Sequence, residues 1–185
     1  MNYDEMVDKL SRILSPSRFR HSLGVSRSAV ELAERFGADI NKARVAGILH
    51  DCARELPGET LLQMAEKFGI VVNDVESHSP SLLHAPVGAR LAQEQYGIHD
   101  IAILQAITLH TVGGPVMTVL DQIVYLADFI EPGRVFPGVD QLRLLAGKNL
   151  REAVLAGYDQ TLNYLVARRG LIHPATVEGR NALLV

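Results

Sequence analysis

Six side chains that could bind a metal are spread along the chain, and the adjacent pair His50-Asp51 is the most informative part of this set. The pair ends an otherwise apolar helical segment, and a buried carboxylate is costly unless it is paired or binds a metal. The other inward-facing candidates are His21, His84, His110 and Asp128. These residue types and their spacing predict a metal-dependent hydrolase of phosphate esters or anhydrides.

The predicted ligands are nitrogen and oxygen donors without a thiolate. Such a set suits iron, manganese, cobalt or zinc better than copper(I) or an iron–sulfur cluster. Six ligands are too many for one catalytic ion that must also bind water, so we expect two ions about 3.5–4 Å apart. Asp51 follows a ligand directly in sequence, which makes it the expected bridge and a catalytic residue. The two ions would share a bridging hydroxide as nucleophile, so no separate general base is expected.

Positive groups near the predicted ligands are candidates for phosphate binding. Each of the three arginines expected to do so lies within one or two helical turns of a ligand. The predicted substrate-binding residues are Arg18, Arg54, Thr111 and Arg134. Arg54 is also expected to stabilise charge that develops during the reaction. The residues expected outside the site are Arg20, His78, His99 and His173.

The elements that must position these side chains are all predicted to be helices. Sustained period-two alternation is absent, and the only strand-like fragment covers residues 70–72. Caps, prolines, glycines and apolar periodicity predict helices over 16–36, 40–50, 57–68, 84–96, 101–110, 117–130, 139–146 and 149–169, and a short one from residue 174. The Pro- and Gly-rich loop over 132–138 follows Asp128 directly and is the expected active-site loop.

The bulk properties fit one globular domain over residues 1–185. A net charge of −3 argues against a nucleic-acid partner, which needs a basic face. No apolar run is long enough to span a bilayer. The single Cys52 and the acidic N-terminus predict a cytoplasmic protein without a disulfide.

The order His21, His50-Asp51, Asp128 resembles the HD-domain metal-dependent phosphohydrolases, and His84 with His110 matches the subset that holds two ions. Longer stretches closely resemble the YqeK family, whose members are symmetrical diadenosine tetraphosphate hydrolases. They are Leu83-His-Ala-Pro-Val-Gly-Ala, His110-Thr-Val-Gly, Tyr125-Leu-Ala-Asp-Phe-Ile-Glu-Pro-Gly-Arg134, and His173-Pro174 with Arg180-Asn181. The resemblance covers essentially the whole chain.

The resemblance implies an all-α, single-domain HD-domain helical bundle with a buried dinuclear metal site. It implies symmetrical hydrolysis of diadenosine tetraphosphate to two ADP by a pair of divalent or mixed-valence ions, foremost iron. One ion would be held by His21, His50, Asp51 and Asp128, and the other by Asp51, His84 and His110. Relatives also suggest a homodimer. Many relatives carry lysine where this chain has Arg54, and arginine keeps the charge but is a poor proton donor.

Three alternatives remain open at the level of the residues. An HD-type nucleotidase or another nucleotide phosphohydrolase would use the same metal core, because that core does not read the base. A di-iron oxygenase is a second class, which the neighbouring arginines disfavour. A non-catalytic binding module is a third, and the presence of all six ligands counts against it. Phe129, Phe136 and Tyr125 are candidate stacking partners for a base, with core packing preferred for Tyr125.

Overall fold

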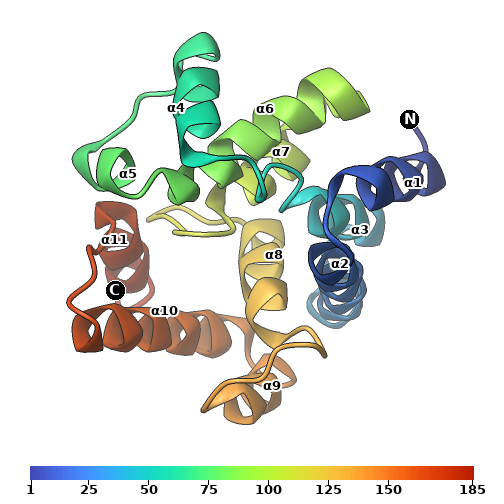
Figure 1. Cartoon of the computed structure of the whole chain (residues 1–185). Coiled ribbons are helices and arrows are strands. Elements are labelled where there is room, and N and C mark those ends of the chain that lie inside the picture. The colour runs from blue at the N-terminus through green and yellow to red at the C-terminus, as the bar shows by residue number, and fades with distance from the viewer.

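The computed structural model describes residues 1–185 and consists of helices joined by loops, with no strand. Figure 1 shows the arrangement of these elements. In chain order they are α1 (Tyr3–Ile13), α2 (Pro16–Phe36), α3 (Ile40–Leu49), α4 (Gly58–Lys67), α5 (Asp74–His78), the 3₁₀ turn η1 (Pro80–Leu83), α6 (His84–Tyr96), α7 (Ile101–Leu109), α8 (Val119–Ile130), α9 (Val139–Ala146), α10 (Leu150–Ala167) and α11 (Pro174–Ala182). The predicted all-α fold class is confirmed.

Capping side chains, prolines and glycines set where several helices begin and end. Ser15 caps α2 by accepting a hydrogen bond from the Arg18 backbone amide, with proline in the first turn. Gly37 ends α2 in the left-handed conformation, at φ +72°, which costs a residue without Cβ little. Thr118 opens α8 with a capping box to Asp121. The predicted helices over 16–36, 84–96 and 139–146 match the bounds of α2, α6 and α9.

Two parts of the chain, residues 3–13 and residues 70–83, differ from the predictions. No element was assigned to residues 3–13, although Met6 and Leu10 lie one turn apart and are buried on one face of α1. The strand-like fragment at 70–72 is an irregular connection between α4 and α5, because no second strand lies beside it to complete a ladder. The short α5 and η1 were also not predicted, since each is too brief to show periodicity.

Helix α8 lies at the centre of the molecule (Figure 1). It packs against α2, α3, α7, α9 and α10. One contiguous hydrophobic cluster joins these helices and includes Val25, Leu49, Ile107, Ile123 and Tyr158. The first four of these come from α2, α3, α7 and α8, so the helices that carry predicted ligands share one core.

Helices α2 and α3 approach each other closely because Gly47 has no side chain. A Cβ atom at Gly47 would lie 2.8 Å from the Cα atom of Ser26, which is backbone and cannot move aside cheaply. This contact lies in the last turn of α3 and brings the end of α3 against α2. No helix of the protein has the length and apolar character needed to cross a membrane.

Candidate metal centre

The structure brings all six predicted ligands to one buried locus. They come from the interior of α2, the two residues that follow α3, the start of α6, the residue that follows α7, and the last turn of α8. The six are His21, His50, Asp51, His84, His110 and Asp128, and they fall into three overlapping groups that could each hold an ion. His50, Asp51, His84 and His110 are each at most 4% exposed.

Asp51 divides the cluster into two halves, because its two carboxylate oxygens face different histidines. Asp51 Oδ1 lies 3.2 Å from His84 Nε2 and 3.7 Å from His110 Nε2. Asp51 Oδ2 lies 3.4 Å from His50 Nε2 and 3.7 Å from His21 Nε2. This is the geometry of a carboxylate that can serve two ions at once.

Asp128 lies closest to the half that contains His21 and His50. Its Oδ1 lies 2.9 Å from His21 Nε2 and 3.9 Å from His50 Nε2. One half of the cluster therefore offers two histidines and two carboxylates, and the other offers two histidines and the shared carboxylate.

Three of the four histidines are oriented by backbone carbonyls at the ends of helical stretches. The Nδ1 atoms of His50, His84 and His110 lie 2.8, 2.5 and 2.7 Å from the carbonyl oxygens of Gly47, Ser81 and Ile107, each three residues earlier. A carbonyl can only accept, so each Nδ1 donates its proton. The Nε2 atoms then carry the lone pairs that face the centre.

The short distances between the histidine Nε2 atoms show that these side chains fit metal ions. His84 Nε2 and His110 Nε2 are 3.1 Å apart, and His21 Nε2 and His50 Nε2 are 3.3 Å apart. Lone pairs this close repel one another unless a cation lies between or beside them, and two carboxylates add further negative charge. Nitrogen and oxygen donors in this number match divalent transition metals.

Burial and the opposing charges set the ionisation of the cluster. Burial alone would raise the pKa of Asp51, but its contacts with His50, His110 and His84 outweigh burial and hold this pKa well below its ordinary value. Burial would also raise the pKa of Asp128, but the neighbouring His21, His50 and Arg134 lower this pKa below its ordinary value. The pKa of His84 is lowered, chiefly by burial. Ionised carboxylates and a neutral imidazole are the forms that bind metal.

Glu131 is a buried part of the site to which the sequence analysis gave no role. It is the C-cap of α8 and is 5% exposed. Its Oε1 lies 3.1 Å from His21 Nδ1, and its Oε2 accepts a 2.6 Å hydrogen bond from the Gly133 amide. Glu131 lies inside the motif that carried the family resemblance, and that motif was the only signal that could have pointed to it.

The predicted phosphate-binding residues differ in how they lie relative to the ligands. Arg18 Nη1 donates a 2.8 Å hydrogen bond to Asp51 Oδ2. Arg134 Nε donates a 2.7 Å hydrogen bond to the Asp128 carbonyl, and its guanidinium also contacts the Asp128 carboxylate. Thr111 Oγ1 lies 3.0 Å from His110 Nε2 and 3.2 Å from His84 Nε2. Two arginines and a hydroxyl therefore border the centre.

Arg54 is half-buried in the turn after α3, and its side chain makes no hydrogen bond or ion pair. It does not line the large cavity described below. Its role in phosphate binding and catalysis therefore stays a prediction. Arg20 is exposed, as predicted.

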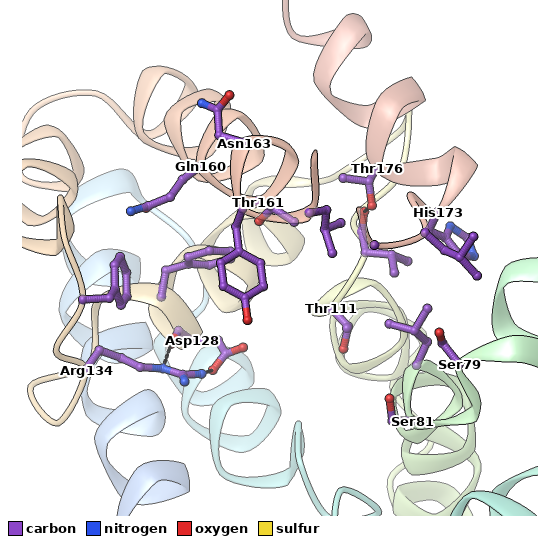
Figure 2. Close-up of a pocket in the computed structure, with 18 of the residues that line it drawn as sticks. Ser79, Ser81, Thr111, Asp128, Arg134, Gln160, Thr161, Asn163, His173 and Thr176 are labelled. Carbon is purple, nitrogen blue, oxygen red and sulfur yellow. Dashed lines mark hydrogen bonds and ion pairs between the residues drawn. The ribbon is translucent and has the colours of Figure 1, made fainter. Parts of the chain in front are cut away.

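A cavity of about 850 Å³ opens beside the candidate metal centre. Figure 2 shows Asp128 and Arg134 at one end, His173 at the other, and Thr111 between them. Aromatic rings from α8, α10 and the loop 131–138 line it, namely Phe129, Tyr164 and Phe136. The cavity places apolar surface and polar groups within reach of the candidate ligands, as a ligand-binding cleft requires.

The remaining predictions about single residues have mixed outcomes. Tyr125 is fully buried in the core, as preferred, whereas Phe129 and Phe136 line the cavity. His78 and His99 are exposed. His173 is a loop residue as predicted, but it also caps α11 and lines the cavity, with its Nε2 2.8 Å from Asn73 Nδ2.

Comparisons with known proteins agree with this description. The family model described as HD domain matches residues 18–133. The chain is 42% identical to the symmetrical bis(5'-nucleosyl)-tetraphosphatase of Bacillus subtilis, over 95% of this chain and 94% of that protein. It is 37% identical to the protein of the same description from Halalkalibacterium halodurans, over 100% and 98% of the two chains. A crystal structure of a predicted HD superfamily hydrolase from Clostridium acetobutylicum superposes with a TM-score of 0.97, at 42% identity over 100% of this chain and 97% of that chain.

Proposed function

The chain belongs to the HD domain family and groups there with the symmetrical bis(5'-nucleosyl)-tetraphosphatases, and from this membership we propose that it hydrolyses diadenosine tetraphosphate to two ADP. The observation that carries the proposal is the position of Asp51 between two pairs of histidines, beside a cavity large enough for a nucleoside. The expected HD-domain hydrolase class and enzymatic activity are confirmed at the level of the family.

Two groups of residues would hold the metal ions. His21, His50, Asp51 and Asp128 would hold one ion, and Asp51, His84 and His110 the other, in line with the distances from the two oxygens of Asp51. When bound, such a pair of ions supplies an activated water and draws negative charge away from a phosphoryl group. We propose iron as the ion, with manganese, cobalt and zinc as the other candidates for this donor set.

The side chains around the centre would bind and orient the polyphosphate. Arg18 and Arg134 already direct their guanidinium groups to the carboxylates of the centre, so each lies within reach of a phosphate held there. A guanidinium can bind two phosphate oxygens at once, which fixes the orientation of the chain of phosphates. Thr111 Oγ1 would add a hydrogen bond, and Arg54 would stabilise charge on the departing nucleoside diphosphate.

The cavity would hold one nucleoside of the substrate. Phe129 and Phe136 offer ring faces on which a base can stack, and stacking of this kind contributes about 1–3 kcal/mol per base. Gln160 and Asn163 are amides on the same wall, where they could read hydrogen-bonding groups of a base (Figure 2). With a nucleoside in this cavity, the phosphates extend toward the ligands, which suits cleavage of the central anhydride bond.

The decisive experiment is product analysis. Purified protein, with its metal content measured, is incubated with diadenosine tetraphosphate, and the products are separated by chromatography. ADP as the sole product, lost on chelation and restored by added metal, is the expected result. ATP with AMP would contradict the position of cleavage, and no turnover by protein that holds two ions would contradict the proposed substrate.

A further inference from the structure

We propose that Glu131 is the positioning residue for His21, and that Gly24 is required because it gives Glu131 the space to do so. The inference rests on the proposed function insofar as it assumes that His21 binds a metal ion. It concerns a buried carboxylate and a glycine that are not metal ligands themselves.

His21 differs from the other three histidines of the cluster in its place within a helix. His50, His84 and His110 lie at ends of helical stretches, where a carbonyl three residues earlier accepts the Nδ1 proton. His21 is in the second turn of α2, where the carbonyls are taken up by the hydrogen bonds of the helix. Its Nδ1 proton therefore needs an acceptor from elsewhere in the chain.

Glu131 supplies that acceptor from a residue 110 positions away. Its Oε1 lies 3.1 Å from His21 Nδ1, while His21 Nε2 faces Asp128 Oδ1 at 2.9 Å. A carboxylate that accepts the Nδ1 proton fixes the tautomer and the ring orientation, and makes Nε2 a stronger donor to a metal. The other oxygen of Glu131 is held by the Gly133 amide, so the carboxylate cannot swing away freely.

Gly24 makes this approach possible. It lies three residues after His21, on the same face of α2. A Cβ atom at this position would lie 2.5 Å from Glu131 Oε2 and 3.3 Å from Glu131 Cβ. An alanine would therefore push the carboxylate off His21 without removing any polar group from the site.

The backbone around Glu131 is also held by hydrogen bonds that do not involve the Glu131 side chain. Arg143, on α9, donates hydrogen bonds to the carbonyls of Ile130, Glu131 and Arg134. Substitution of the Glu131 side chain should therefore leave the end of α8 in place, so a change in metal binding can be assigned to His21.

The test is titration of the metal-free protein with Co²⁺, followed by visible absorption and chelator competition, with the melting temperature as a check of the fold. We expect two ions in the wild type. Glu131→Ala should weaken one of them by about 100-fold and alter its absorption band, and Glu131→Gln, which keeps a neutral acceptor, by about 10-fold. The other ion should bind as in the wild type.

The variant Gly24→Ala should reproduce the weakening seen in Glu131→Ala, although alanine favours the helix itself. In the double variant, Gly24→Ala should have no further effect, because there is no carboxylate left to displace. Matched controls are Glu34→Ala, an exposed glutamate of α2, and Gly157→Ala in α10, where a Cβ would make an ordinary 3.4 Å contact. Both should bind two ions as the wild type does.

Two results would overturn the inference alone. The first is unchanged Co²⁺ affinity and spectrum in Glu131→Ala while the wild type binds two ions. The second is a loss of Co²⁺ affinity on Gly24→Ala that is the same in the wild type and in Glu131→Ala. This result would contradict the role proposed for Gly24. Failure of the folded wild type to bind any ion would overturn the proposed metal centre itself, and the inference with it.

Discussion

Asp51 Oδ1 and His84 Nε2 lie 3.2 Å apart although the two residues come from different helical segments. The opposite oxygen of Asp51 faces His50 and His21 instead. Asp51 thus belongs to both halves of the cluster, whereas His84 belongs to one, and the two residues should respond differently to substitution.

The Asp51→Ala variant should therefore bind fewer metal ions than the His84→Ala variant. Asp51→Ala is expected to lose both ions and to lower kcat/KM by about 10³-fold or more. His84→Ala is expected to keep the ion held by the half that contains His21. Metal analysis by mass spectrometry, together with circular dichroism to confirm the helical fold, separates the two outcomes. Full activity in Asp51→Ala would contradict the assignment of the centre.

Replacement of Arg54 tests a residue that has no partner in the structure. Arg54→Ala should slow turnover by about 10- to 100-fold without removing metal, because a guanidinium that stabilises developing charge acts in the transition state. Arg20→Ala, which removes an exposed arginine, is the matched control and should be neutral. Loss of metal from Arg54→Ala would show that Arg54 supports the ligands instead.

The cavity beside Asp128 should contribute mainly to substrate affinity. Phe136→Ala removes one ring from its wall and is expected to raise KM about tenfold with little change in kcat, the equivalent of about 1.4 kcal/mol of stacking. The neighbour Val135 is 92% exposed, and Val135→Ala serves as the control from the same loop. Steady-state kinetics with diadenosine tetraphosphate measure both. A fall in kcat alone would place Phe136 outside the nucleoside site.

The hydroxyl of Tyr158 should stabilise the loop that follows Thr111. It accepts a 3.1 Å hydrogen bond from the Gly114 amide and lies where a Cβ at Gly113 would collide with it, at 1.8 Å. Tyr158→Phe leaves that buried amide unpaired and should lower the free energy of unfolding by about 1–3 kcal/mol. Gly113→Ala should cost more, because Gly113 also has a φ of +69°. Urea unfolding measures both, and an unchanged midpoint in Tyr158→Phe would contradict this role.

Glu55 should make the stability of the protein depend on pH in the acid range. Hydrogen bonds from the side chain and the backbone amide of Ser15 lower the pKa of Glu55 below its ordinary 4.5. A carboxyl group whose pKa is lowered by folding stabilises the fold fully above its unfolded pKa, and this contribution is lost as the pH falls through the folded pKa. The stability difference between wild type and Glu55→Gln should therefore be constant above about pH 5 and shrink on acidification.

The difference at neutral pH should be about 1 kcal/mol or less, because Glu55 is exposed to solvent. Thermal unfolding at a series of pH values checks this, with Glu34→Gln as the exposed control. A difference that grows as the pH falls would have the wrong sign. Glu55 matters for the site because it ties the start of α2, which carries His21, to the turn that follows Asp51.

Much of the fold could be predicted from the sequence because the signals are local. A cap such as Ser15, a stop such as Gly37 and an apolar stripe such as that of α8 act within a few residues. They need no knowledge of the rest of the chain. Helix α1 was not predicted, although Met6 and Leu10 provide an apolar spacing that indicates a helix. The short α5 has no such spacing.

The sequence by itself determined which side chains are candidates for the chemistry of this protein. The types and order of six candidate ligands were readable, because each sits on or beside an apolar stripe whose burial demands a partner for a polar group. The motif that ends in Arg134 was readable as a family resemblance. Neither result required a distance between residues.

Only the tertiary structure decided how these residues meet. It showed which oxygen of Asp51 faces which histidines, and that Glu131 reaches His21 across 110 positions through the space at Gly24. It also formed the cavity, whose walls come from α8, α10, α11 and the loops around them. These relationships depend on how helices far apart in sequence pack together, and local helix propensity does not predict that packing.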